Sequence, residues 1–144
     1  MSDLHIELTN PRDLSDNEWK ILNKILSINF SGKDLIYKQL KTAKVISYCP
    51  CGCKTVDIQV DDTLPKYELN KRIPVELKTF SKDGIPIIAS IHLVNGYINE
   101  LEIYRADSGQ ICEDIDLDNS SIEVFWDTII EVWNEYNEWM QSWR

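Results

Sequence analysis

The sequence predicts an α+β domain in which two N-terminal helices precede an antiparallel sheet of about five strands and one long C-terminal amphipathic helix follows. Apolar residues recur at steps of three and four near both ends of the chain and at steps of two between them. The 144 residues are 43% hydrophobic and contain no low-complexity linker. We therefore expect a single domain, residues 1–144, with one core.

The first two helices have clear local signals. Ser15 and Glu18 form a capping-box pattern. Apolar residues follow it at helical spacing: Trp19, Leu22, Ile25 and Leu26. After residues 31–34 a second helix is expected, with Leu35, Ile36 and Leu40 on one side.

The middle of the chain has the period of a sheet. Strands are predicted over residues 44–48, 55–60, 75–81, 85–94 and 97–105. Asn95-Gly96 indicates a two-residue type I′ hairpin, and Pro86 favours the start of a strand or an edge. Residues 61–72 and 106–120 are polar and predict loops.

From Ser121 onward the pattern predicts a helix that runs nearly to the end. Its apolar stripe comprises Ile122, Phe125 or Trp126, Ile129, Trp133, Tyr136, Met140 and Trp143. Its carboxylates are Glu123, Asp127, Glu131, Glu135 and Glu138. A core helix with a solvated acidic back is the default interpretation. Carboxylates three or four apart repel, and no lysine relieves them, which favours a partner-facing acidic side.

Charge is distributed unevenly along the chain. Residues 99–144 carry twelve carboxylates and two arginines, whereas residues 1–98 are almost neutral, with thirteen basic and twelve acidic residues. A one-sided negative segment attracts basic partners and repels nucleic acid and anionic membranes. The N-terminus has neither the basic region nor the apolar region of a signal peptide. No run of apolar residues is long enough to form a membrane-spanning helix. We expect a cytoplasmic protein.

The acidic loop and the final helix together form the predicted partner-binding surface. Residues 113–118 begin like a calcium loop, but Asn119 replaces the required glycine and Phe125 the bidentate glutamate, so calcium is not expected. A solvated loop is the alternative. The residues predicted to bind a basic partner are Asp107, Glu113, Asp114, Asp116, Asp118, Glu123, Asp127, Glu131, Glu135 and Trp139.

The four cysteines of a cytoplasmic protein are reduced thiols or metal ligands. Cys49, Cys51 and Cys53 are spaced at two, and Cys112 is distant in sequence. In an extended strand this spacing spreads the thiols too far apart to share a metal unless Pro50 and Gly52 fold the loop. We expect reduced thiols, no cofactor and well under one metal per chain. A zinc-stabilised structural or regulatory domain using all four cysteines is the alternative.

Enzyme signatures are missing from the sequence. It has neither a nucleophile elbow, nor a phosphate-binding glycine loop, nor a His-Glu-x-x-His motif. His5 and His92 are its two histidines, and a structural role is the commoner explanation for the second. A binding protein is therefore favoured over an enzyme, with a small hydrolase or transferase using a carboxylate pair as the weakest alternative.

Several short motifs resemble a family of small bacterial proteins. They are Cys51-Gly-Cys53, the alternating residues 55–60, Asp83-Gly84, residues 94–97 with Asn-Gly-Tyr, and Leu-Glu-Ile-Tyr at 101–104. Some members of that family are immunity proteins of polymorphic toxins of the LXG type, whose toxins are often nucleases. The resemblance covers about residues 44–105 and implies a cytoplasmic inhibitor of a secreted toxin.

Charge and resemblance lead to the same hypothesis. A nuclease binds phosphate, so its cleft is basic, and an inhibitor that presents carboxylates can occupy the cleft. The sequence predicts an immunity protein, or antitoxin, that acts in bacterial competition by neutralising a basic toxin domain, with nuclease as the expected activity. No binding of nucleic acid or membrane is expected.

Overall fold

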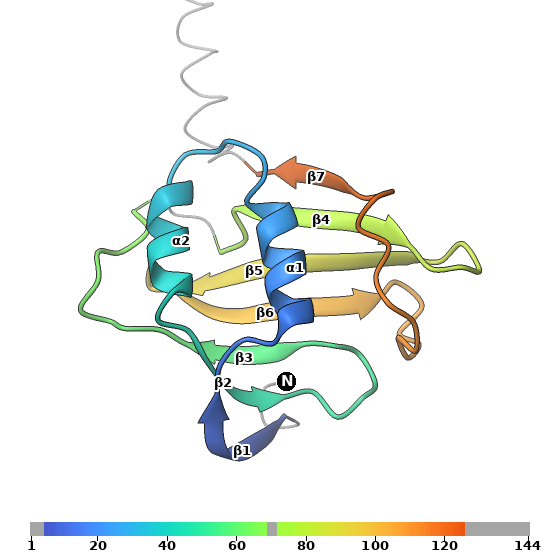
Figure 1. Ribbon diagram of the computed structural model, residues 1–144, viewed down its shortest axis with the longest axis horizontal. Helices are drawn as coiled ribbons and strands as arrows, with labels where there is room; N and C mark the ends of the chain where they lie inside the picture. Colours follow the sequence, from blue (N-terminus) through green and yellow to red (C-terminus); the bar gives the residue numbers. More distant parts are fainter. Residues whose placement is uncertain (1–4, 69–71, 126–144) are drawn as a thin grey trace, which may run out of the picture.

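A computed structural model of the protein, which describes residues 5–68 and 72–125, contains one antiparallel sheet with two helices on one of its faces (Figure 1). The elements in chain order are β1 (Ile6–Arg12), α1 (Asp16–Ile25), α2 (Lys33–Leu40), β2 (Lys44–Tyr48), β3 (Val56–Gln59), β4 (Val75–Phe80), β5 (Pro86–Val94), β6 (Tyr97–Arg105) and β7 (Ser121–Val124). The strand order is β1-β2-β3-β6-β5-β4-β7, and each neighbouring pair is antiparallel.

Helix α1 begins as predicted, at a complete capping box. The backbone N–H of Glu18 donates to Ser15 Oγ at 3.1 Å, and the Glu18 carboxylate accepts from the Ser15 N–H at 2.8 Å. Both bonds use donors that the start of a helix otherwise leaves unpaired. Arg12 of β1 forms a two-point contact with the same carboxylate, at 2.9 and 3.0 Å. The pKa of Glu18 is lowered because these hydrogen bonds outweigh the effect of its burial.

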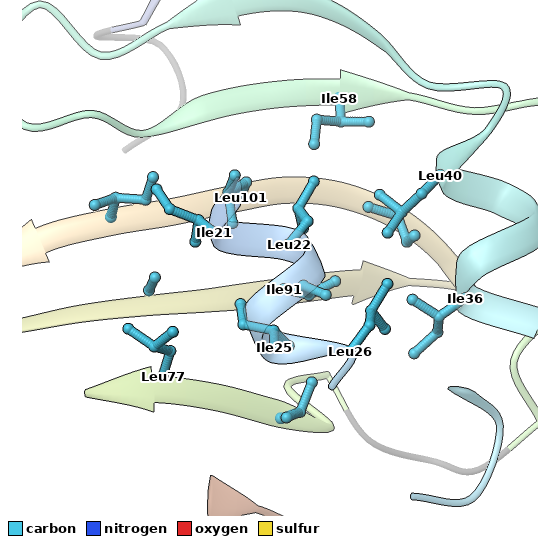
Figure 2. Packing of buried hydrophobic residues seen from close by; sticks show 14 of the residues in the cluster. Ile21, Leu22, Ile25, Leu26, Ile36, Leu40, Ile58, Leu77, Ile91 and Leu101 are labelled. Carbon is cyan, nitrogen blue, oxygen red and sulfur yellow. The ribbon is translucent and has the colours of Figure 1, made fainter. Parts of the chain in front are cut away.

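The helices bury one face of the sheet. Apolar side chains of α1 and α2 point onto the central strands, among them Leu22, Ile25, Ile36 and Leu40 (Figure 2). They meet Ile91 of β5 and Leu101 of β6, both fully buried. Full burial of each such side chain stabilises the fold by roughly 1.5–3 kcal/mol. Neither described helix is long and apolar enough to cross a membrane.

Strand alternation assigns the remaining side chains to the two faces. In β4 the buried positions are Val75, Leu77 and Thr79, and the positions between them are polar or exposed. The same holds for β6, where Leu101 and Ile103 face the core. No helix within the described residues covers the opposite face, which we call the open face (Figure 1).

The predicted hairpin at Asn95-Gly96 is confirmed. Both residues have positive φ, 53° and 84°, as a type I′ turn requires. The buried Gln39 ties α2 to this turn, since its amide donates to Gly96 O at 3.0 Å and its carbonyl accepts from Ile98 N at 3.0 Å. The N–H of Tyr67 also donates to Gly96 O, at 2.8 Å. The turn is therefore packed between α2 and the segment that leads to β4.

The predicted fold class is wrong in the number of strands and at both ends of the sheet. Seven strands replace the expected five, and β1 precedes the first helix. Strand β1 is almost wholly exposed and contains Pro11, and its alternation is limited to Ile6 and Leu8, which is too short to predict a strand. It is held by backbone pairing with β2.

The C-terminal prediction is also corrected. Residues 121–124 form β7 instead of the first turn of a helix. Ile122 and Val124 pair with Leu77 and Val75 and pack against the core, which is a period of two. The rest of the predicted helix, with Asp127, Glu131, Glu135 and Trp139, lies outside the described residues.

We predict that two glycines in turns differ in their tolerance of alanine. Gly84 and Gly96 both have positive φ, 82° and 84°, but a Cβ at Gly84 has no atom within 4 Å, whereas one at Gly96 would lie 2.9 Å from Tyr67 O. Gly84→Ala should lower the free energy of unfolding by about 1 kcal/mol through backbone strain alone. Gly96→Ala should lower it clearly more. Urea unfolding measures both, and equal losses would contradict the packing described for the Asn95-Gly96 turn.

Candidate functional site

Carboxylates line the open face in two rows that cross the strands. The register aligns Glu123 of β7, Glu76 of β4, Ser90 of β5 and Glu102 of β6 in the first row. The second row runs through His92, Glu100, Asp57 and Ser47. These residues occupy the outward positions of strands whose other positions fill the core.

The first row holds like charges side by side. The pKa of Glu76 is raised, first by burial and then by repulsion from Glu123, with a smaller contribution from Glu102. Lys78 of the same strand partly opposes this shift. A half-buried carboxylate between two others is electrostatically unfavourable in the free protein. A cation that binds beside such a carboxylate stabilises its charged form.

His92 lies between two glutamates of β6. Its Nε2 is 3.1 Å from Glu102 Oε1, and its Nδ1 is 3.7 Å from Glu100 Oε1. Arg72 Nε donates to Nδ1 at 3.4 Å. The hydrogen bond from His92 lowers the pKa of Glu102, whereas burial raises the pKa of Glu100. Two adjacent carboxyls thus differ in their proton affinity.

His5 and Asp57 form a second contact in this row. His5 Nδ1 is 2.6 Å from Asp57 Oδ2, and the Ser47 hydroxyl donates to the same oxygen. Two groups of possible metal ligands share Glu100: one with His5 and Asp57, the other with His92 and Glu102. Within each group the donor atoms lie within 4.8 Å of one another. Imidazole nitrogens and carboxylate oxygens are ligands for divalent ions such as zinc and manganese.

The loop between β2 and β3 gathers three thiols. The sulfur of Cys51 lies 2.9 Å from that of Cys49 and 3.0 Å from that of Cys53. The intervening Gly52 has a φ of 94°, which folds the loop back on itself. Hydrogen bonds from Cys49 and Cys53 lower the pKa of the Cys51 thiol to about 7.

This loop is the exception that the sequence left open, in which Pro50 and Gly52 fold the chain. The positive φ of Gly52 breaks the extended conformation and brings the thiols together. Cys112, the fourth ligand of the alternative zinc site, does not join the group that the described residues form. It is exposed and follows Ile111, whose N–H donates to Gly52 O at 3.0 Å.

The thiols and the second row belong to one hollow. It has a volume of about 560 Å³ and is lined by both kinds of side chain. His5, Asp57, His92, Glu100 and Glu102 contribute to one part of its lining, and Cys49, Cys51 and Cys53 to another. Arg105 also lines it, but its guanidinium is held by Asp83 at 3.1 Å and by Asp107 at 2.8 Å.

The structure separates the residues that the sequence assigned to one acidic surface. Glu123 lies on the open face, and Asp107 is paired with Arg105. The acidic loop, residues 106–120, returns on the helix side, where Ile115 and Leu117 pack against the core and Asp114 lies beside α1 (Figure 1). Glu113 accepts from the Lys82 N–H, and Asp116 accepts from Asn119. Asp118 is exposed in the same loop.

Sequence reasoning missed most of the open face. The alternation of residues 55–60 places Asp57 outward, but no motif pointed to Glu76, Glu100 or Glu102. Their outward positions in predicted strands were a usable signal. The pairing of His5 with Asp57, 52 residues away, had no such signal.

Comparison with known families gives one match. Residues 11–114 match the DUF6984 family, which is described as a domain of unknown function. The chain belongs to this family. The matched region of the DUF6984 domain runs from within β1 to the acidic loop and includes the cysteine loop and the second row of the open face. A search of curated proteins and a search of solved structures each returned no match.

We predict that two neighbouring glutamates have opposite effects on stability. At neutral pH Glu100→Gln should raise the free energy of unfolding, because it removes a half-buried charge that Glu102 and Asp57 repel. Glu102→Gln should lower it, because the charged form of Glu102 is stabilised by His92.

The pH dependence follows from the signs of the two shifts. The pKa of Glu100 is raised above the ordinary 4.5, so the folded parent binds a proton at this carboxyl more readily than the unfolded chain does. The stability that Glu100→Gln gains over the parent should therefore shrink as the pH falls through the raised pKa. The contribution of Glu102, with its lowered pKa, should be lost at lower pH, below 4.5. Thermal melts of both variants between neutral and acidic pH test this. Shifts of the same sign would contradict the described geometry.

Proposed function

We propose that the protein is a cytoplasmic immunity protein that neutralises a basic toxin domain by presenting the open face to it. The observation that carries the proposal is the group of five carboxylates on the outward positions of β3, β4, β6 and β7. They are Asp57, Glu76, Glu100, Glu102 and Glu123. The resemblance of residues 44–105 to immunity proteins supports the same function.

The basic groups close to these carboxylates do not balance them. The guanidinium of Arg105 is occupied by two aspartates. Within residues 5–68 and 72–125, Arg72 and Lys78 are permanent cations near the two rows. The two carboxylates with raised pKa values, Glu76 and Glu100, are stabilised in their charged form when lysines or arginines approach them.

A nuclease fits this surface as the partner. Its active cleft binds phosphates and is therefore basic. Carboxylates spaced along adjacent strands can occupy such a cleft in place of the phosphates, and the encounter is accelerated by opposite charge. This mode of inhibition predicts fast association that slows as salt is added.

The open face is a better contact surface than the acidic loop. Asp107 and Asp116 of the loop already accept hydrogen bonds from Arg105 and Asn119, and two of its apolar residues pack against the core. Carboxylates that are already paired have less to gain from a new partner. We therefore assign the proposed contact to the open face and not to the acidic loop. Of the residues that the sequence predicted to bind a basic partner, Glu123 remains in this surface.

We predict that charge reversal on the open face abolishes protection. Glu76→Lys with Glu123→Lys should leave the fold intact, since both side chains point away from the core. The matched control is Asp114→Lys with Asp118→Lys, which makes the same change in net charge on exposed residues of the acidic loop. A neighbouring gene that encodes a secreted protein with a basic C-terminal domain would supply the partner, and survival of cells that co-express that domain is the measurement.

The expected result is loss of protection and an association rate roughly 10-fold or more slower for the open-face variant, with near-parental behaviour of the control. Thermal melts establish that both variants fold. If the open-face variant protects fully and the loop variant does not, the contact surface is the loop. If both protect as well as the parent, the proposed inhibition through the open face is refuted, and so is inhibition through the acidic loop.

A further inference from the structure

The cysteine loop has a geometry that the toxin-binding proposal does not use. We propose that Cys49, Cys51 and Cys53 form a binding site for a thiolate-seeking metal ion, zinc in the first place, with three protein ligands and one open coordination position. The site stands on the positions of the three sulfur atoms and is independent of the proposed function.

The sulfur positions are close to those that zinc requires. Zn–S bonds of about 2.3 Å in a tetrahedron place the sulfurs roughly 3.8 Å apart. The observed separations are 2.9 and 3.0 Å, and the three sulfurs all lie within 4.8 Å of one another. To admit the ion, the side chains must rotate outward and widen these two short separations.

The backbone holds the loop in this shape from both sides. At its base the Cys49 N–H donates to Thr55 O at 3.1 Å, and the Lys54 N–H donates to Ile103 O of β6 at 3.2 Å. At its tip Gly52 O accepts from the Ile111 N–H at 3.0 Å. A Cβ on Gly52 would lie 2.4 Å from Gln110 Cγ, so the tip packs closely against the acidic loop. The thiols are thus gathered before any metal binds.

The donor type selects the class of ion. Thiolates bind zinc and monovalent copper and have little affinity for magnesium or calcium. The imidazole–carboxylate groups of the same hollow offer only nitrogen and oxygen. Zinc can occupy either kind of ligand set, so the experiment must separate the two.

Three ligands leave the fourth position of a tetrahedral ion to an external group. Cys51 is exposed, and all three thiols line the hollow of about 560 Å³. The fourth ligand is therefore water or a donor atom of a molecule in the hollow. Structural zinc sites are closed by four protein ligands, so this site differs from the four-cysteine zinc site that the sequence suggested as an alternative.

The test is the metal content of the full-length chain, purified under a phosphine reductant and loaded with Zn²⁺. We expect about one zinc per chain for the parent. Cys51→Ser and Cys53→Ser should each weaken zinc binding by more than roughly 10–100-fold, which is the loss caused by substituting residues that only hydrogen-bond the metal ligands. Cys112→Ser is the matched control and should bind like the parent, because its thiol lies outside the group. A competing chromogenic chelator gives the affinities.

A second measurement separates the two ligand sets by the absorption spectrum of the bound ion. Co²⁺ loaded into the parent should give the intense charge-transfer absorption of thiolate ligation. His92→Ala with Glu100→Gln should leave that absorption unchanged, and Cys51→Ser should remove most of it. The proposal is overturned if the reduced parent binds no zinc, if Co²⁺ gives no thiolate absorption, or if zinc is lost in the His92→Ala, Glu100→Gln variant and kept in Cys51→Ser.

Discussion

The packing of two helices against one face of the sheet is the constraint on which the rest of the structure depends. That face is shielded from water by four helix residues, Leu22, Ile25, Ile36 and Leu40. Every second side chain of the strands packs against them. Alternation then sends the intervening residues to the opposite face. Because antiparallel register aligns these residues across strands, polar groups far apart in sequence become neighbours, and Glu76 meets Glu123 in this way. The open face is thus a direct consequence of how the core is built.

Charge on the open face conflicts with stability. Burial and mutual repulsion raise the pKa values of Glu76 and Glu100, so these carboxylates are held in a less favourable state than in water. Only part of the cluster is compensated: His92 stabilises Glu102, and His5 contacts Asp57. Residues retained against stability are characteristic of surfaces that bind something. A cationic partner removes the same repulsion that the free protein must tolerate, which connects the electrostatics of the face to the proposed inhibition of a basic toxin.

Two kinds of chemistry share the hollow at the edge of this face. The thiols come from the β2–β3 loop, and the imidazoles and carboxylates come from the outward positions of the strands and from His5. They meet because β3 pairs with both β2 and β6, which places the cysteine loop beside the end of the second row. The acidic loop contributes differently: it supports the tip of the cysteine loop through Ile111 and packs its apolar residues on the core. Its role in the fold explains why its carboxylates are dispersed.

The sequence by itself determined the features whose signals are local. The capping box at Ser15 and Glu18, the positive-φ turn at Asn95-Gly96 and the five central strands all follow from a few adjacent residues, and the structure contains each of them. Only the tertiary structure decided that β1 and β7 complete the sheet. Both are held by backbone hydrogen bonds to strands distant in the chain, and their alternating apolar residues are too few to predict a strand from the sequence. The candidate site divides in the same way. The cysteines were visible as a motif, but their convergence required the backbone of Gly52, and the rows of the open face required a register that no single strand encodes.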